Sequence, residues 1–161
     1  MDEDPVLFKD KINFKPPGNR PDLLHQDQQA GWSDYAPYFV TLCICLDPNT
    51  PLNGCLQLPD EKSYIHQTRV FGNKESPLKI EDIPSLSLRE YVADPGDIFL
   101  FDSYVPHASN PNMSQEQRRN IYLTYNKASD GNHHTRYYQD KYLSYPPNSY
   151  RCGDLKYEYK V

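Results

Sequence analysis

The stretch that decides the fold is PGDIFLFDSYVPHAS, at residues 95–109. A Pro-Gly turn launches the apolar run of residues 97–101, and His107 follows shortly after the run ends. A histidine at the end of a strand lies at the mouth of a sandwich or barrel, where ligand sites form. The stretch therefore predicts a short β-strand followed by a candidate ligand, with a hydrogen-bonded structural histidine as the alternative.

Other segments repeat this pattern of short strands between turns. Residues 11–15 alternate polar and apolar side chains, as a half-exposed strand does. Residues 38–46 form a continuous apolar run, which is typical of a strand covered on both faces. Further strands are predicted at residues 54–58, 63–67, 88–92, 97–101 and 120–126. Several short strands at such spacing favour a mostly β sandwich or barrel with few helices.

A second candidate ligand set lies ahead of most of these strands, in His25-Gln26-Asp27. Residues i and i+2 of an extended segment project to the same side, so His25 and Asp27 face one point. A His-x-Asp pair with a distant histidine, here His107, forms the 2-His-1-carboxylate triad that holds non-haem Fe(II) and leaves positions open. Each histidine alone has an ordinary structural explanation, but the combination predicts an iron oxygenase.

Arg118 follows His107 where a dicarboxylate cosubstrate needs a cation. Its guanidinium can bind a carboxylate through two parallel hydrogen bonds. Arg119 is the competing residue, and on a strand the two side chains point in opposite directions. Ser109, at i+2 from His107, lies on the same face of an extended segment and is placed to add a hydrogen bond.

Four stretches together resemble the phytanoyl-CoA dioxygenase family of Fe(II)/2-oxoglutarate oxygenases. They are HQD at 25–27, LNGCLQLP at 52–59, the stretch at 95–109, and NPNMSQEQR at 110–118. The last two are contiguous and specific. The segments HQDQQAGW at 25–32 and TRYYQDKYLSYPP at 135–147 are similar to a bacterial subgroup that oxidises small polar compounds, including aminoalkylphosphonates.

The resemblance implies a double-stranded β-helix, a cupin-like jelly roll, with iron at its open end. It implies Fe(II) held by His25, Asp27 and His107, and the cosubstrate 2-oxoglutarate held by Arg118. The middle residue of the first motif, Gln26, projects away from the metal-facing pair, yet in relatives it can contact 2-oxoglutarate. The implied reaction uses O2 to hydroxylate a C–H bond of a small polar or acyl substrate, with succinate and CO2 as coproducts.

The chain departs from the family pattern in two places. The family continues from its Asn-Gly strand into Pro-Gly-Ser-His, whereas this chain reads PDEKSYIH at 59–66, so no role of that loop is carried over to His66. Family members also have a substantial segment before the metal motif. We therefore expect a single catalytic jelly-roll domain at 1–161 that is short at its N-terminus, or a truncated form.

Residues 71–86 form one long predicted connection, reading FGNKESPLKIEDIPSL. A loop of this length in a compact domain is usually functional or mobile. A lid over the substrate and a solvated surface excursion are both open alternatives. Trp32, Tyr35 and Tyr38 are in turn candidates either for the pocket or for the core.

Charge and composition limit the partners. With 17 basic and 22 acidic residues the formal net charge is −5, which argues against nucleic acid or an anionic membrane as the main partner. No apolar run approaches the roughly 20 residues that span a bilayer, and the chain begins MDED rather than with a signal sequence. The four cysteines lack zinc-finger spacing, and Cys43 and Cys45 fit a buried strand face. We expect a cytoplasmic protein with a small-molecule substrate, which can form a homo-oligomer.

Three functions are compatible with these residues. The first is a 2-oxoglutarate-dependent hydroxylase. The second is a cupin-like metal enzyme that does not use 2-oxoglutarate and has no need of Arg118. The third is a non-catalytic or truncated paralogue that binds metal or ligand, which the short N-terminus supports and the intact triad opposes.

Overall fold

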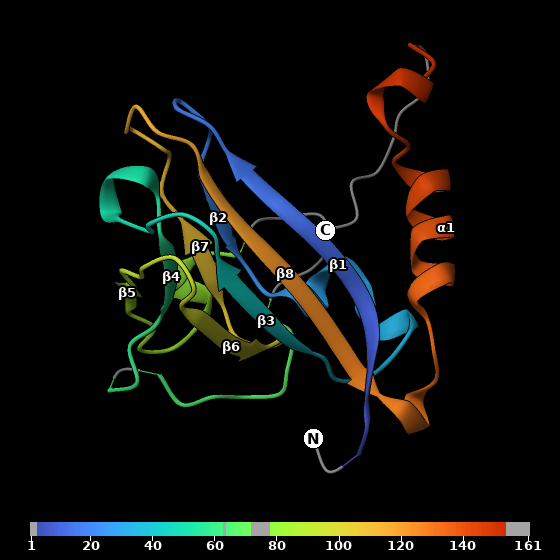
Figure 1. Cartoon of the computed structure of the whole chain (residues 1–161). Helices are drawn as coiled ribbons and strands as arrows, with labels where there is room; N and C mark the ends of the chain where they lie inside the picture. The colour runs from blue at the N-terminus through green and yellow to red at the C-terminus, as the bar shows by residue number, and fades with distance from the viewer. Residues whose placement is uncertain (1–2, 63, 72–77, 154–161) are drawn as a thin grey trace.

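The computed structural model describes residues 3–62, 64–71 and 78–153. Two four-stranded antiparallel sheets face each other, which is the predicted double-stranded β-helix, or jelly roll (Figure 1). The strands are β1 Pro5–Lys15, β2 Asp22–His25, β3 Val40–Cys45, β4 Leu56–Pro59, β5 Leu88–Glu90, β6 Ile98–Asp102, β7 His107–Ser109 and β8 Arg118–Lys127. One α-helix, α1 His134–Ser144, follows β8 through a short 3₁₀ turn.

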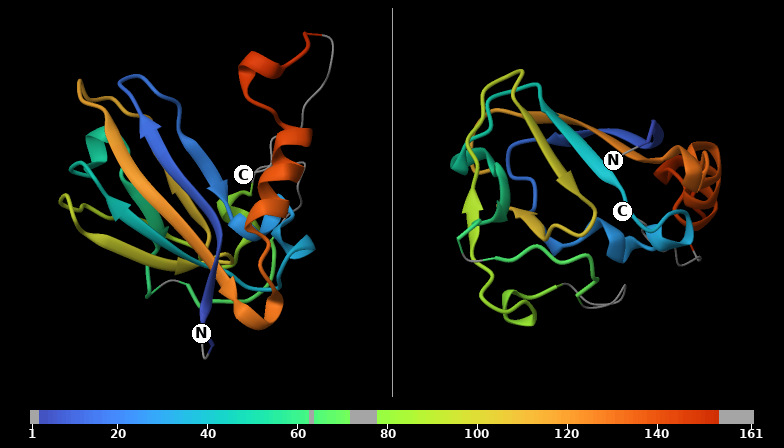
Figure 2. Two further views of the ribbon diagram at one scale, coloured as in Figure 1. Left: turned by 45° about the vertical axis from the view of Figure 1, so that its right-hand side comes forward. Right: turned by 90° about the horizontal axis from the view of Figure 1, so that it is seen from below.

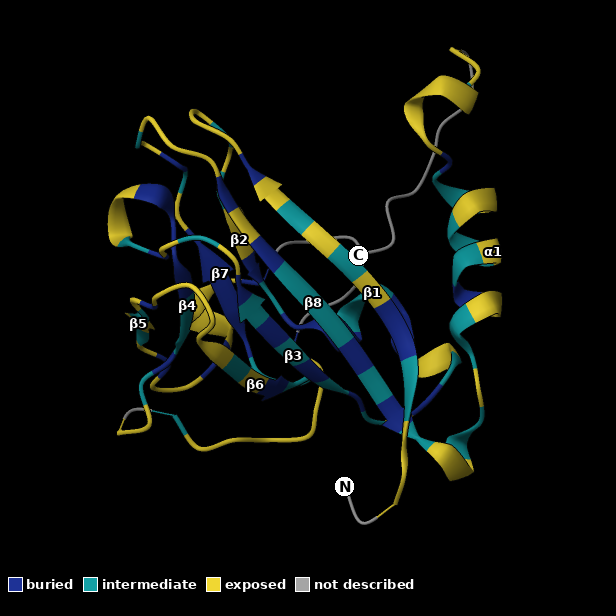
Figure 3. Cartoon of the chain, in the orientation of Figure 1, coloured by how far each residue is buried: buried dark blue, intermediate teal, exposed yellow. Residues whose placement is uncertain are grey.

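One sheet has the strand order β1-β8-β3-β6 and contains the two longest strands, β1 and β8. We call it the major sheet. Its inner face is polar where β1 and β8 meet. Arg118, Asn120 and Thr124 of β8 are buried on that face, and the Thr124 hydroxyl lies 3.0 Å from the hydroxyl of Thr41 on β3. Figure 3 shows this alternation of burial along β8. A polar inner face is unusual for a core, and it indicates a surface that lines a site.

The minor sheet has the order β2-β7-β4-β5. It faces the major sheet across a small apolar cluster that includes Cys43, Leu56 and Phe101, which come from both sheets. Its strands β2 and β7 pair antiparallel, and His25 stands directly opposite His107. The sheet register therefore brings together two residues that are far apart in the sequence.

The outer face of the major sheet is apolar. Ile12, Ile121, Ile44 and Ile98 form one row across all four strands, because each is the register partner of the next. Ile12 and Ile98, on the two edge strands, are 49% and 57% exposed. In the described part of the chain, this row is thus open to solvent at both edges of the sheet.

The helix α1 lies alongside β1 at the edge of the major sheet (Figures 1 and 2). Tyr137 of α1 is buried in an aromatic cluster, where its ring centroid lies 4.7 Å from that of Phe8. His134 Nε2 lies 2.7 Å from an Asp10 carboxylate oxygen, which ties the start of the helix to β1. The helix ends one residue before Tyr145, which precedes Pro146, because proline disfavours a helical conformation in the residue before it.

Two sequence-based expectations differ from the structure. The strand predicted at 38–46 is β3, but only one of its faces is fully buried, since Thr41, Cys43 and Cys45 are buried while the alternate residues are half-buried. The strand predicted at 63–67 is wrong for residues 64–67, which are irregular, and residue 63 lies outside the described residues. The run of β-branched residues favoured a two-sided strand because the outer face of the major sheet is itself apolar.

The long connection predicted at 71–86 is anchored at both of its described ends. Phe71, Leu78, Ile83 and Leu86 are buried together against Leu24 of β2. Residues 72–77 lie outside the described residues. The described parts of the connection therefore belong to the packed protein beside the strand that carries His25.

In the LNGCLQLP stretch, the backbone conformation and a close neighbour at position 54 both require a glycine. Its φ is +72°, and a Cβ at this position would lie 2.1 Å from the carbonyl oxygen of Asn110, just after β7. We expect Gly54→Ala to lower the free energy of unfolding by roughly 2–5 kcal/mol, measured by denaturant titration, because strain and overpacking add. Gly18→Ala is the matched control, since Gly18 has φ +73° but no atom within 4 Å of its added Cβ. Equal losses in the two variants would contradict the steric explanation.

The described residues include no helix that is both long and apolar enough to cross a membrane. Cys43, Cys45 and Cys55 are buried thiols. Burial raises the pKa of the Cys43 thiol to about 11, so this side chain is a neutral packing residue.

Candidate metal and cosubstrate site

His25, Asp27 and His107 converge on one point. Each offers one ligand atom, and these atoms lie within 4.8 Å of one another. The two histidine rings face each other across the β2–β7 pair, with centroids 4.2 Å apart. Asp27 joins them because Gln26 is extended and Asp27 begins the 3₁₀ turn Asp27–Ala30. The predicted triad is thus assembled by a strand pair and a turn.

The imidazoles are oriented for metal binding by backbone carbonyls. His25 Nδ1 lies 2.6 Å from the Leu23 carbonyl oxygen, and His107 Nδ1 lies 3.0 Å from that of Val105. Because a carbonyl only accepts, each Nδ1 carries the proton, which leaves each Nε2 lone pair for a metal. Two neutral imidazoles and one carboxylate form the donor set that non-haem Fe(II) takes, so these residues fit the metal.

The electrostatics of the triad favour the ligating protonation states. Burial, followed by the neighbouring His107, lowers the pKa of His25 to about 4, so its imidazole is neutral near pH 7. Burial opposes ionisation of Asp27, but His107 and then Lys9 outweigh it and hold the pKa of this carboxyl below its usual value. The site therefore presents a carboxylate at Asp27 and a neutral imidazole at His25.

Gln26, between the two ligands, is completely buried and holds three backbone groups. Its amide nitrogen donates to the carbonyl oxygens of Arg69 at 3.0 Å and Tyr104 at 2.5 Å, and its amide oxygen accepts from Phe71 N at 2.7 Å. These contacts fix the segments on either side of the triad. The predicted contact of Gln26 with 2-oxoglutarate stays a prediction.

We expect Gln26→Ala to lower the free energy of unfolding by roughly 2–4 kcal/mol, because it leaves buried backbone groups without partners. We also expect about a 10-fold weaker affinity for Fe(II), since the support of His25 and Asp27 loosens. Denaturant titration and metal titration measure the two effects. Gln67→Ala, at an exposed glutamine, serves as the control. Unchanged metal affinity in a folded Gln26→Ala protein would contradict the positioning role.

Arg118 points inward, whereas Arg119 points outward, as the strand alternation predicted. Arg118 is 3% exposed and donates from Nη1 to the Asn49 amide oxygen at 2.9 Å. Its Nε is buried and has no hydrogen-bond partner among the described residues. Arg119 instead binds Asp47 through Nε at 2.9 Å and Nη2 at 2.8 Å. A buried guanidinium with an unpaired donor fits a carboxylate ligand.

Ser109 belongs to a polar group around Lys15 that sequence reasoning found only in part. The Ser109 hydroxyl accepts from Lys15 Nζ at 2.5 Å and donates to the Asp22 carboxylate at 2.6 Å. Lys15 is the register partner of Arg118, and both cations are buried. The alternation of polar and apolar side chains at residues 11–15 places Lys15 on the polar face of a strand. The alternation alone does not say that this polar face is the inner one.

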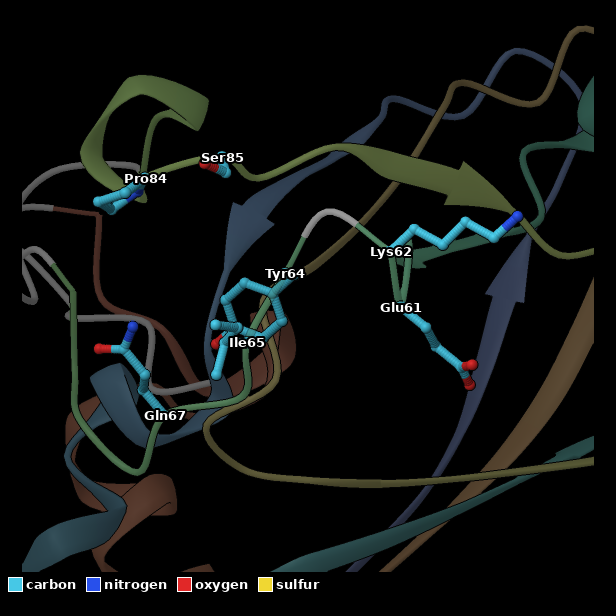
Figure 4. A pocket seen from close by; sticks show the side chains of 7 residues that line it. All are labelled: Glu61, Lys62, Tyr64, Ile65, Gln67, Pro84 and Ser85. Atoms are coloured by element: carbon cyan, nitrogen blue, oxygen red, sulfur yellow. The ribbon is translucent and has the colours of Figure 1, made fainter.

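Two other candidate residues have structural partners. Trp32 is core, in the aromatic cluster with Phe8, and His66 Nε2 binds the Asp102 carboxylate at 2.7 Å. A pocket of about 390 Å³ lies between the segment after β4 and the end of the 71–86 connection. Figure 4 shows its lining residues, Glu61, Lys62, Tyr64, Ile65, Gln67, Pro84 and Ser85. None of the predicted site residues lines this pocket.

Comparison with known families identifies the chain. The family model described as phytanoyl-CoA dioxygenase matches residues 4–120, which contain the triad and Arg118. The chain belongs to the phytanoyl-CoA dioxygenase family. It is 35% identical over 157 residues to a 2-aminoethylphosphonate dioxygenase of an uncultured bacterium, covering 98% of this chain and 59% of that protein. It is 37% identical over 146 residues to a methylphosphonate hydroxylase of Gimesia maris, covering 90% of this chain and 54% of that protein.

Solved structures agree with the family fold. The apo structure of EctD from S. alaskensis matches with a TM-score of 0.67 and 23% identity, over 80% of this chain and 47% of that one. Further structures of EctD contain bound Fe, or 2-oxoglutarate with 5-hydroxyectoine. This chain thus shares the fold of EctD, and it spans somewhat more than half the length of the curated relatives described above.

Proposed function

We propose that the protein is an Fe(II)- and 2-oxoglutarate-dependent dioxygenase that hydroxylates a C–H bond of a small polar substrate. The observation that carries this proposal is the convergence of His25, Asp27 and His107, with the buried Arg118 on the neighbouring sheet. A cupin-like enzyme without 2-oxoglutarate gives no reason for a buried guanidinium with an unpaired Nε. The family and its oxygenase relatives support the same reaction class.

His25, Asp27 and His107 would hold the iron through two imidazole nitrogens and a carboxylate oxygen. When bound, iron supplies the oxidation of a C–H bond by O2, while 2-oxoglutarate is converted to succinate and CO2. Arg118 would bind the distal carboxylate of 2-oxoglutarate, and Ser109 would add a hydrogen bond beside it. Gln26 lies between two ligands, and its backbone contacts keep His25 and Asp27 in place. The buried position of Arg118 excludes water, which strengthens its attraction for a carboxylate.

The substrate class that we propose is a small organophosphonate. Relatives at 35% and 37% identity are named for 2-aminoethylphosphonate and methylphosphonate. The chain covers 59% and 54% of these proteins, so the activity of the 161-residue chain itself is part of the proposal. A non-catalytic paralogue that keeps the metal is the competing outcome.

An anaerobic titration with Fe(II) and 2-oxoglutarate tests the proposal. We expect the visible charge-transfer band of the iron chelate, followed in air by succinate formation that increases with 2-aminoethylphosphonate or methylphosphonate. Bound iron without the band would favour the cupin-like alternative. A band without succinate formation in the presence of either phosphonate would favour the non-catalytic paralogue.

A further inference from the structure

The inner face of β1 carries a row of cations. A β-bulge interrupts the pairing with β8 between Leu7 and Lys9, and both Phe8 and Lys9 are buried as a result. From Lys9 onward the odd-numbered residues, including Lys11, face inward, while the even-numbered residues are exposed. A bulge that turns an additional side chain inward is often found beside a functional site. Here the bulge places a lysine in the interior.

Lys9 makes no close ion pair within the described part of the chain, although the carboxylate of Asp27 partly offsets its charge. Its side chain is almost fully buried, at 2% exposure, and it makes no hydrogen bond or ion pair with the described residues. Its ammonium lies over aromatic rings instead, 4.8 Å from the centroid of Trp32 and 5.8 Å from that of Tyr137. Burial, followed by the cation of Lys11, lowers the pKa of Lys9 well below its usual range. A buried ammonium without an ion pair is unfavourable, and either loss of its proton or an anionic ligand relieves this cost.

The two lysines lie near the triad. Lys9 and Lys11 both interact electrostatically with Asp27, and Lys11 also interacts with His25. Lys11 Nζ lies 5.1 Å from the ring centroid of Tyr122, its register partner on β8. Like Lys9, Lys11 makes no ion pair with the described residues. Both cations therefore lie on the inner face of β1, within electrostatic range of the metal ligands.

These lysines are separated from the group that we assign to 2-oxoglutarate. Lys15 is the register partner of Arg118, whereas Lys9 pairs with Thr124 further along β8. At the usual rise of a strand, the Cα atoms of Lys9 and Lys15 are about 20 Å apart. A carboxylate bound at Arg118 is therefore too distant to contact Lys9.

We propose that Lys9 and Lys11 form the recognition site for an anionic group of the substrate, a phosphonate or a carboxylate. This assignment rests on the proposed function and specifies how its substrate is held. The aromatic rings of Trp32 and Tyr137 position the Lys9 ammonium, and the anion binds between it and the metal. The lysines are substrate-binding residues on this assignment, and a substrate without an anionic group is bound poorly.

Direct binding tests the assignment without turnover. Methylphosphonate is titrated calorimetrically into the full chain loaded anaerobically with Fe(II) and 2-oxoglutarate, with propionate as the carboxylate and dimethyl methylphosphonate as the uncharged ester. We expect at least one anion to bind and the ester to bind at least tenfold more weakly. Tighter binding of methylphosphonate or of propionate identifies which anion the site prefers.

The decisive variants are Lys9→Met and Lys11→Met, with Lys79→Met at an exposed lysine as the control. We expect Lys9→Met to weaken anion binding by about 10- to 100-fold, the range of a lost charge-assisted hydrogen bond. The Kd for 2-oxoglutarate stays within about twofold in all three variants. The midpoint of thermal unfolding of Lys9→Met is equal to or above that of the parent, because the substitution removes a buried amine that makes no ion pair. Lys11 is half-buried, so Lys11→Met provides the test if Lys9→Met does not fold.

Two results would overturn the assignment. One is an unchanged anion Kd in Lys9→Met with a lower unfolding midpoint, which would make Lys9 a purely structural cation over Trp32. The other is a parent chain that forms the iron chelate but binds neither anion, which leaves the proposed function standing. If the parent forms no chelate, the proposed function fails. The anion site is then tested alone by methylphosphonate binding to the metal-free protein. Weaker binding in Lys9→Met supports the site, and unchanged binding overturns it.

Discussion

Asp27→Ala is expected to abolish stable Fe(II) binding and all succinate formation. Asp27 supplies the only negative charge of the triad, and its carboxylate lies within 4.8 Å of the ligand atoms of His25 and His107. Changing a residue that merely supports a metal ligand already weakens metal affinity by about 10- to 100-fold. Loss of the carboxylate itself should therefore raise the Kd for Fe(II) by more than about 100-fold. Anaerobic metal titration measures this change directly.

A thermal measurement separates loss of metal from loss of fold. Metal that binds only the native state raises the unfolding midpoint, so Fe(II) should stabilise the parent chain and leave Asp27→Ala unchanged. Asp34→Ala is the matched control, because Asp34 is exposed in the next 3₁₀ turn, Trp32–Asp34. A folded Asp27→Ala protein that still forms the chelate band would show that Asp27 is not a ligand.

The convergence of His25, Asp27 and His107 was predictable from the sequence because it follows from short spacing and strand pairing. His25 and Asp27 are separated by one residue, and any extended backbone turns them toward one point. The approach of His107 follows from the antiparallel pairing of β2 with β7, which places it opposite His25. The opposite directions of Arg118 and Arg119 follow from strand alternation in the same way.

The surroundings of the triad were not predictable, because they depend on irregular backbone and on which face is covered. The bulge that buries Lys9 has no signature in the sequence, and the alternation at residues 11–15 is equally consistent with polar residues outside. The strand at 38–46 was predicted to be covered on both faces because its half-buried outer residues are apolar as well. The helix α1 was not predicted either, since it buries only Tyr137 and lacks the apolar stripe that marks a helix.

Arg118→Ala is expected to weaken 2-oxoglutarate binding while leaving Fe(II) binding intact. The guanidinium is held by Asn49 on one side and retains an unpaired Nε, so it is preorganised for a carboxylate. Removing one partner of a buried, hydrogen-bonded charge pair typically costs about 2–5 kcal/mol. The Kd for 2-oxoglutarate should accordingly rise by about 30-fold to several thousandfold. Titrating the chelate band with 2-oxoglutarate at saturating Fe(II) measures the shift.

Arg119→Ala is the control that the strand itself provides. Its guanidinium is on the opposite face and pairs with Asp47, with side-chain exposures of 45% and 18%. An exposed ion pair of this kind contributes at most about 1 kcal/mol to stability. We therefore expect Arg119→Ala to bind 2-oxoglutarate like the parent.

If Arg118→Ala also kept the parent affinity, the assignment of Arg118 would be wrong. Lys15, its buried register partner, which is hydrogen-bonded to Ser109, would then become the candidate ligand of the carboxylate. If both arginine variants lost affinity equally, the effect would arise from the end of β8 rather than from a specific carboxylate contact.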